Sequence, residues 1–127
     1  MLDTVKGNLS YINAGHYAPI LVSSAEIKEQ LDATGPAVGM MESSSFEIGQ
    51  SQLEPGDFLV AYTDGIDEAR NPLGEFFGKE RLLSMLKRKS SSVTTLLKQI
   101  EMAVMIHTAA GEPSDDITML GIRRKPM

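Results

Sequence analysis

The sequence contains no cysteine, which excludes disulfide bonds, thiolate metal ligands and cysteine nucleophiles. Histidine is scarce as well, and two histidines without a cysteine argue against a structural zinc site. No apolar run approaches the roughly 20 residues that a membrane-spanning helix needs. The segment Met1–Lys6 also lacks the apolar core of a secretory signal peptide. These absences predict a cytoplasmic protein that does not contact a membrane.

Basic residues are outnumbered by acidic ones. The 12 Lys and Arg residues face 17 Asp and Glu residues, so the net charge is −5. This balance argues against nucleic-acid binding, which needs a basic surface. The carboxylates instead leave room for a site that binds a hard cation through oxygen ligands. The length of 127 residues suits one compact domain with a core of its own.

The first half of the chain has the pattern of strands and turns. Four segments read as strands because apolar residues alternate or run together: Leu9–Asn13, Pro19–Val22, Phe46–Gln50 and Phe58–Tyr62. Residues 25–32 are ambiguous, and Thr34–Gly39 reads as a loop. The segment Leu53–Asp57 predicts a type II turn, because proline and glycine occupy its two central positions.

The second half of the chain has the period of helices. The segment Lys79–Lys89 and a second segment from Val93 to about Ala109–Gly111 each place their leucines and other apolar residues on one face. Asp116–Ile122 then reads as a final strand and Arg123–Met127 as a solvated tail. This order predicts an α+β fold with two helices against a mostly antiparallel sheet.

Two carboxylate clusters lie where predicted strands end or begin. Asp64 follows a buried strand and precedes Gly65, and Asp115 and Asp116 precede the last strand. A carboxylate at a strand end is held rigidly, and a neighbouring glycine allows close approach of backbone or solvent. Such oxygen ligands suit Mg²⁺ or Mn²⁺. Taken singly, an Asp-Gly after a strand is more often a plain turn than a metal site, and Asp115 could simply cap a turn.

Five segments of the sequence form an ordered set of motifs: Tyr11–Ile20, Gly35–Gly39, Leu53–Leu59, Tyr62–Asn71 and Asp115–Met119. Taken together, they resemble the bacterial SpoIIE-like branch of the PPM metal-dependent serine/threonine protein phosphatases. The ordered match runs from about residue 7 to residue 122, and its last two segments are the most specific.

The resemblance implies a role for each residue of the two carboxylate clusters. Asp64 corresponds to the metal-binding aspartate of the family's Asp-Gly motif, and Gly65 is the glycine of that motif. Asp115 corresponds to the metal-binding aspartate near the end of the domain, with Asp116 beside it. The family has an α-β-β-α sandwich and uses two Mn²⁺ or Mg²⁺ ions to hydrolyse phosphoserine or phosphothreonine. Phosphorylated anti-sigma-factor antagonists are among its substrates.

The sequence departs from the family at one motif. No Asp-x-x-Gly-His-Gly occurs, so the family's metal-bridging aspartate has no counterpart here. Residues 1–127 are therefore expected to form a single, truncated phosphatase domain with an incomplete two-ion site, which would weaken metal binding and activity. An uncovered sheet edge would favour a homo-oligomer. The alternative is an inactive interaction module. Haloacid-dehalogenase-like chemistry is excluded, because Ile66 stands where it needs an aspartate.

Other polar residues have more ordinary interpretations. His16 is expected to bond backbone within a turn, and His107 to stabilise a helix end. Asp67 and Glu68 are expected on a solvated face, with a role as outer metal ligands as the alternative. Arg70 could approach phosphate or hold the turn together, and both interpretations stay open. The basic run Lys87–Lys89 is read as a solvated helix end.

Overall fold

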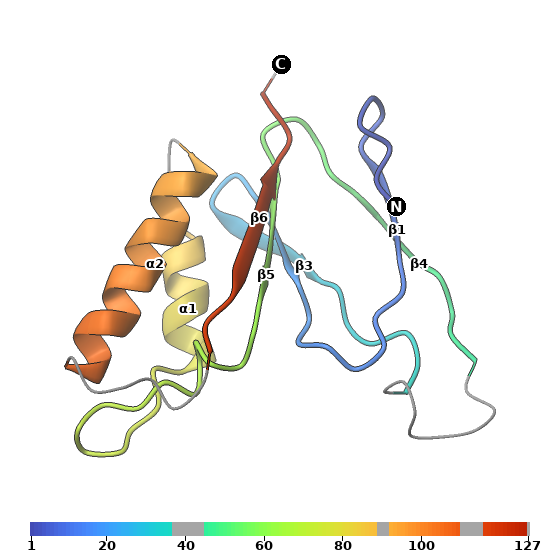
Figure 1. The fold of residues 1–127 in the computed structure, drawn as a ribbon. Helices are drawn as coiled ribbons and strands as arrows, with labels where there is room; N and C mark the ends of the chain where they lie inside the picture. The colour runs from blue at the N-terminus through green and yellow to red at the C-terminus, as the bar shows by residue number, and fades with distance from the viewer. Residues whose placement is uncertain (37–44, 89–91, 110–115, 127) are drawn as a thin grey trace.

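A computed structural model describes residues 1–36, 45–88, 92–109 and 116–126. Within these ranges the chain forms six strands and two helices (Figure 1). In chain order they are β1 (Asn8–Tyr11), β2 (Ile20–Ser23), β3 (Glu26–Gln30), β4 (Gly49–Gln52), β5 (Phe58–Tyr62), α1 (Lys79–Leu86), α2 (Val93–Thr108) and β6 (Met119–Arg123). Neither described helix has the length and apolar character to cross a bilayer.

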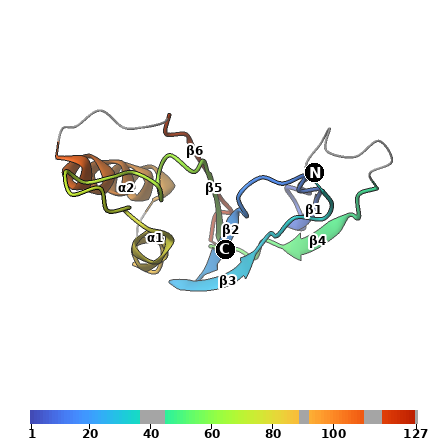
Figure 2. The same cartoon turned by 90° about the horizontal axis from the view of Figure 1, so that it is seen from below.

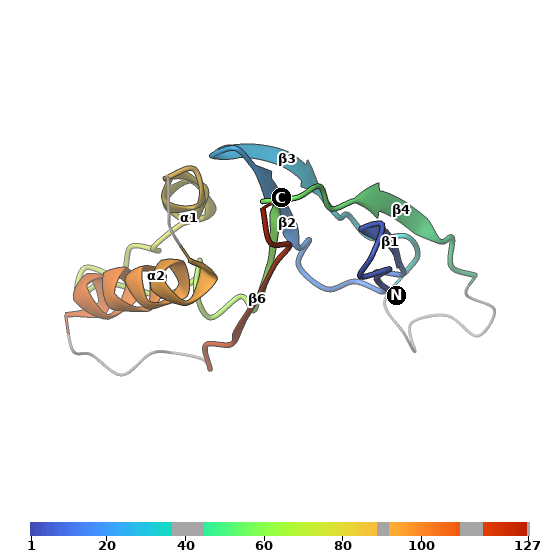
Figure 3. The ribbon, with the colours of Figure 1, turned by 90° about the horizontal axis from the view of Figure 1, so that it is seen from above.

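The strands form two antiparallel sheets. The larger sheet has the order β3-β2-β5-β6, and β1 pairs with β4 in a second, two-stranded sheet. Figures 2 and 3 show both helices on one face of the larger sheet and the β1–β4 pair beyond its other face. The predicted α+β class, with two helices against a mostly antiparallel sheet, is thereby confirmed. The described layers form part of an α-β-β-α sandwich.

The main core lies between the larger sheet and the helices. Side chains alternate along a strand, so every second residue of β2 and β5 faces the helices. The helices meet that face with the apolar stripe that their 3.6-residue period predicts. The buried residues of this core include Ile20, Val22, Val60 and Tyr62 from the strands and Leu82, Leu86, Leu96, Ile100 and Val104 from the helices.

The turn before β5 has the predicted type II geometry. Asp57 N donates to Glu54 O at 2.9 Å, and Gly56 at the second central position has a φ of 89°. The Asp57 carboxylate is buried, accepts from Glu54 N at 2.9 Å and pairs with Lys28 Nζ at 3.2 Å. Three interactions therefore fix where β5 begins.

The predicted solvated tail is wrong for its first two residues. Arg123 belongs to β6, and the Arg124 guanidinium donates to three backbone carbonyls, those of Leu53 at 2.8 Å, Val5 at 2.8 Å and Lys6 at 3.0 Å. Backbone carbonyls without strand partners attract a planar, multidentate donor. The end of β6 is therefore tied to the N-terminal turn of the chain.

The boundaries of other elements differ from the predicted ones. The ambiguous residues 25–32 contain strand β3, and β4 occupies Gly49–Gln52 rather than Phe46–Gln50. The last strand begins at Met119, three residues later than predicted. The predicted loop is described only as far as residue 36, and Gly111, the predicted helix terminator, lies outside the described residues. Ala109 takes the left-handed cap position after α2, with a φ of 52°.

Candidate metal centre

The acidic residues that follow β5 lie on a tight turn, which we call the acidic turn (residues 63–69). Ile66 N donates to Thr63 O at 3.2 Å, and Glu68 N donates to Asp64 O at 3.0 Å. Ile66 is fully buried in the core, whereas Asp64 is partly exposed. The apolar anchor holds the turn against the protein while the Asp64 carboxylate stays at the end of the strand.

Thr63 joins the acidic turn to the segment that leads into β6. Thr63 N donates to Thr118 O at 3.1 Å, and Thr118 N donates back to Thr63 Oγ1 at 3.1 Å. The Thr63 hydroxyl itself donates to Asp116 O at 3.2 Å. The strand register, which opposes Tyr62 and Met119, continues into this exchange. The structure thus brings the Asp64 and Asp116 segments together at one end of the β5–β6 pair. The predicted ligand Asp115 lies outside the described residues.

Asp67 lies only partly on the solvated face expected for it, whereas Glu68 is exposed as expected. The Oδ1 atom of Asp67 is buried and has no hydrogen-bond partner among the described residues. Burial raises the pKa of the Asp67 carboxyl, and the nearby negative charges of Glu68 and Asp64 raise it further. The turn's own backbone bonds and the Ile66 anchor draw Asp67 inward, which the sequence pattern alone does not show.

These carboxylates fit a hard divalent cation in chemical type. A buried carboxylate oxygen without a donor, beside other carboxylates, is an acceptor site that a cation can satisfy. Within the described ranges, however, no three acidic or histidine side chains converge closely enough to hold a metal ion by themselves. The described residues therefore do not form a complete ligand set by themselves.

The turn that contains His16 and Tyr17 lies beside the acidic turn. Tyr17 packs edge-on against Tyr62, with ring centroids 5.9 Å apart, and its hydroxyl donates to Glu68 Oε1 at 3.4 Å. His16 N donates to Asn13 Oδ1 at 2.9 Å, and His16 Nδ1 donates to Tyr17 O at 2.7 Å. The expectation that His16 bonds backbone within a turn is confirmed. The contact between Tyr17 and Tyr62 was not predicted, although each tyrosine lies in one of the segments that carry the family resemblance.

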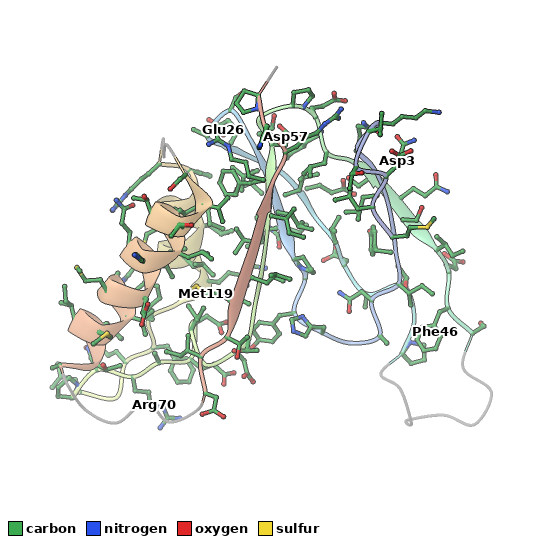
Figure 4. All side chains as sticks on the ribbon, turned by 45° about the horizontal axis from the view of Figure 1, so that its top comes forward. Asp3, Glu26, Phe46, Asp57, Arg70 and Met119 are labelled. Atoms are coloured by element: carbon green, nitrogen blue, oxygen red, sulfur yellow. The ribbon has the colours of Figure 1, made fainter. Side chains whose placement is uncertain are left out.

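The loop after the acidic turn folds back onto it. Phe77 N donates to Ala69 O at 2.7 Å and Gly78 N donates to Asp67 O at 2.8 Å, so the start of α1 is bonded to the turn. Arg70 lies at the lower end of the molecule in Figure 4, with its guanidinium 5.2 Å from the centre of the Phe76 ring. Of its two open roles, these contacts favour the one in which Arg70 holds the turn together.

His107 links both helices to that loop. Its Nε2 donates to Glu75 O at 3.0 Å, and its Nδ1 accepts from Arg81 Nη1 at 2.9 Å. Phe77 packs edge-on against the imidazole with centroids 5.6 Å apart and lies under the Arg81 guanidinium. The expected structural role of His107 at the end of α2 is confirmed, through these contacts as well as its position.

Comparisons with known proteins agree with this architecture. The family model "Stage II sporulation protein E (SpoIIE)" matches residues 1–125. Protein IcfG of Synechocystis is 44% identical over 124 residues, and phosphoserine phosphatase RsbP of Bacillus subtilis is 26% identical over 105 residues. These matches cover 98% and 72% of this chain.

A solved structure shows the same fold. The Mn-presoaked phosphatase domain of SpoIIE from Bacillus subtilis superposes with a TM-score of 0.72 at 17% identity, covering 98% of this chain and 54% of that one. The chain spans 20% of the length of IcfG and 26% of that of RsbP. The likeness therefore concerns part of a phosphatase domain and a smaller part of the full-length relatives.

Proposed function

The chain belongs to the SpoIIE family of metal-dependent protein phosphatases, and we propose that it forms the part of the catalytic domain that carries Asp64 and Asp115 as metal ligands. The reaction is hydrolysis of phosphoserine or phosphothreonine on a bacterial cytoplasmic regulatory protein, with an anti-sigma-factor antagonist as the expected substrate. The name of RsbP, a phosphoserine phosphatase, supports this reaction class.

One observation carries the proposal: Thr63 holds the acidic turn against the start of β6. Its three hydrogen bonds to residues 116 and 118 fix two carboxylate-bearing segments that are about 50 residues apart in sequence. Such fixing is what a metal site needs, because ligands must be held before the ion arrives.

The resemblance to the family supports a role for each site residue. Asp64 and Asp115 would bind the ions directly, Gly65 would leave room for close approach, and Asp116 would bond a ligand or water beside them. Bound Mn²⁺ or Mg²⁺ would supply an activated water and stabilise charge on the phosphoryl group. The described part of the chain lacks a three-ligand cluster, so we propose that further ligands come from the part of the domain that this chain does not span.

The second candidate function is a non-catalytic interaction module built on the same fold. The absence of a three-ligand cluster from the described residues is the observation that favours it. Both candidates share the fold and the family, and they differ only in whether this chain turns over a phosphorylated substrate.

Metal titration tests the role of Asp64. We expect calorimetry with Mn²⁺ to show weak binding by the chain and at least tenfold weaker binding by Asp64→Asn, about 1.4 kcal/mol. Asp32→Asn is the matched control, because Asp32 is an exposed aspartate outside the site and should leave binding unchanged. Equal binding by both variants, or tight binding of two ions by the intact chain, would contradict the proposed incomplete site.

Phosphate release separates the two candidate functions. With a phosphoserine peptide and Mn²⁺, we expect slow release by the chain, and release at least tenfold slower by Asp64→Asn. Asp32→Asn should match the wild type. Binding of Mn²⁺ without any release of phosphate would favour the interaction module.

A further inference from the structure

A pocket with two arginines in its lining lies at the other end of β5 and β6 from the acidic turn. This pocket has a volume of about 430 Å³. Its walls are the turn between β2 and β3, the end of α1, the first turns of α2 and the paired residues Phe58 and Arg123. Figure 1 shows the start of α2, the β2–β3 turn and the end of β6 gathered at the top of the molecule. A volume of this size suits a small organic ligand.

The charge of this pocket is opposite to that of the protein as a whole. Arg88, just after α1, and Arg123, in β6, both line it, and none of the described residues that line it is acidic. Arg88 is exposed, and its guanidinium has no hydrogen-bond or ion-pair partner among the described residues. Two guanidinium groups from separate elements, in a chain of net charge −5, form a local site of attraction for an anion.

The chemistry of the remaining lining restricts the kind of anion. Phe58, Val93 and Leu96 provide an apolar floor, and the hydroxyl-bearing Ser92 stands at the first turn of α2. Guanidinium groups match phosphate oxygens in geometry, whereas the apolar floor suits a ring or a carbon chain. A ligand with a phosphate group and an apolar group can contact both the arginines and the apolar floor. Inorganic phosphate can contact only the arginines.

We propose that this pocket, the basic pocket, binds an organic phosphate monoester, with Arg88 and Arg123 on the phosphate and Phe58, Val93 and Leu96 against the organic part. The basic run Lys87–Lys89, read from the sequence as a solvated helix end, contributes one of these arginines. The basic pocket is separate from the candidate metal centre. Its Phe58–Arg123 pair lies four residues along the strands from the Tyr62–Met119 pair, about 13 Å at the usual rise per residue.

Binding of phenyl phosphate tests the proposal directly. The full chain is titrated by calorimetry in EDTA, so that no divalent cation contributes to binding at the acidic turn. We expect saturable binding, at least tenfold weaker binding by Arg88→Gln, and a smaller loss with Arg88→Lys, which keeps the charge but not the planar fork. Inorganic phosphate should bind at least tenfold more weakly than phenyl phosphate.

Two control variants locate the bound ligand. Lys87→Gln removes the same charge from a neighbouring residue that does not line the pocket, and it should change the affinity by less than about threefold, as expected for a screened surface charge. Asp64→Asn should bind phenyl phosphate as the wild type does. No binding, equal losses in Arg88→Gln and Lys87→Gln, equal binding of inorganic phosphate, or loss of binding in Asp64→Asn would each overturn the proposal. Unchanged thermal unfolding of Arg88→Gln serves as the folding control.

Discussion

Tyr62 is the residue that connects the core to the acidic turn. It is the last residue of β5, it is 2% exposed, and its ring packs against Tyr17. Burial raises the pKa of its phenol to about 12, and the negative charge of Asp67 contributes to the shift. The folded protein therefore favours the neutral phenol well above the pH at which an unfolded tyrosine ionises.

We expect Tyr62 to be the last of the three tyrosines to ionise. In the unfolded chain its pKa is near 10, so between about pH 10 and 12 the unfolded state loses this proton first. The stabilising effect of the neutral phenol is complete below pH 10 and disappears as the pH rises through 12, a loss of about 3 kcal/mol. Absorbance of phenolate at 295 nm, followed from pH 8 to 13, measures the ionisation.

The variant Tyr62→Phe provides the control for this titration. It should remove the most alkaline step from the absorbance curve. Its stability in urea should also fall less between pH 10 and 12 than that of the wild type, because no phenol remains to ionise. A wild-type curve in which all three tyrosines titrate together near pH 10 would contradict the assignment.

Sequence reasoning located some residues of the site and missed others for a physical reason. The position of Asp64 was predictable, because a buried strand followed by Asp-Gly is a local pattern. Thr63 and Tyr17 were missed because their partners are about 50 residues away in sequence. The register of β5 and β6 brings Thr63 to Thr118, and the packing of the His16 turn on the acidic turn brings Tyr17 to Glu68. The burial of one carboxylate oxygen of Asp67 was missed because it depends on the burial of the neighbouring Ile66.

At the scale of elements, the packing of β6 against α2 depends on the absence of a side chain. A Cβ atom on Gly121 would lie 2.2 Å from Val93 Cγ1 and 3.4 Å from Leu97 Cδ1. Val93 is β-branched and stiff at χ1, so it cannot turn away freely. Because β6 leads from the Asp116 segment, the distance between this strand and α2 also affects the candidate metal centre.

We expect Gly121→Ala to destabilise the protein by about 1–3 kcal/mol through overpacking. The Val93→Ala substitution removes the clashing methyl groups, so Gly121→Ala should cost less in the Val93→Ala background. Urea unfolding of the two single variants and the double variant gives the coupling energy. Additive effects, or no effect of Gly121→Ala alone, would show that the strand is not held at this distance by the glycine.

The elements that were predicted well are those whose burial pattern is local. Helix α2 was predicted from its first residue because its apolar period is long and regular. Strand β4 was displaced because its sequence, Gly49–Gln52, is polar, and pairing with β1 defines it. The Tyr11 ring lies over Gly49 in that pairing, with atoms within 3 Å of where a Cβ would stand. This contact helps to fix the register between β1 and β4, which cannot be predicted from the sequence of either strand alone.

At the scale of the whole molecule, the candidate metal centre and the basic pocket lie at opposite ends of β5 and β6. Asp64, Asp67 and Glu68 follow one end of these strands, and Arg88 and Arg123 line the pocket at the other. Each end also holds charge of the other sign: in Figure 4, Arg70 lies at the lower end, and Asp57, paired with Lys28, lies at the upper end. The two sites therefore differ in the residues that line them, and a cation and a phosphate-bearing ligand are expected at opposite ends.

The uncovered edge of the larger sheet leads to a prediction about assembly. Strand β6 is at the edge in the order β3-β2-β5-β6, and among the described residues no strand pairs with its outer side. Leu120 and Ile122 of β6 are 60% and 39% exposed. Edge strands with exposed apolar residues tend to pair with another chain. We therefore expect a homodimer at high protein concentration, formed by antiparallel pairing of two β6 strands about a two-fold axis.

Light scattering over a range of concentrations measures this association. Leu120→Lys places a charge on the edge and should shift the equilibrium toward the monomer by at least tenfold in the dissociation constant, because two charges meet across the axis. Leu73→Lys is the matched control, since Leu73 is 84% exposed and lies in the loop between β5 and α1, outside strand β6. It should leave association unchanged. A monomeric mass for the wild type at millimolar concentration would refute the prediction, because an open apolar edge would then be stable without a partner.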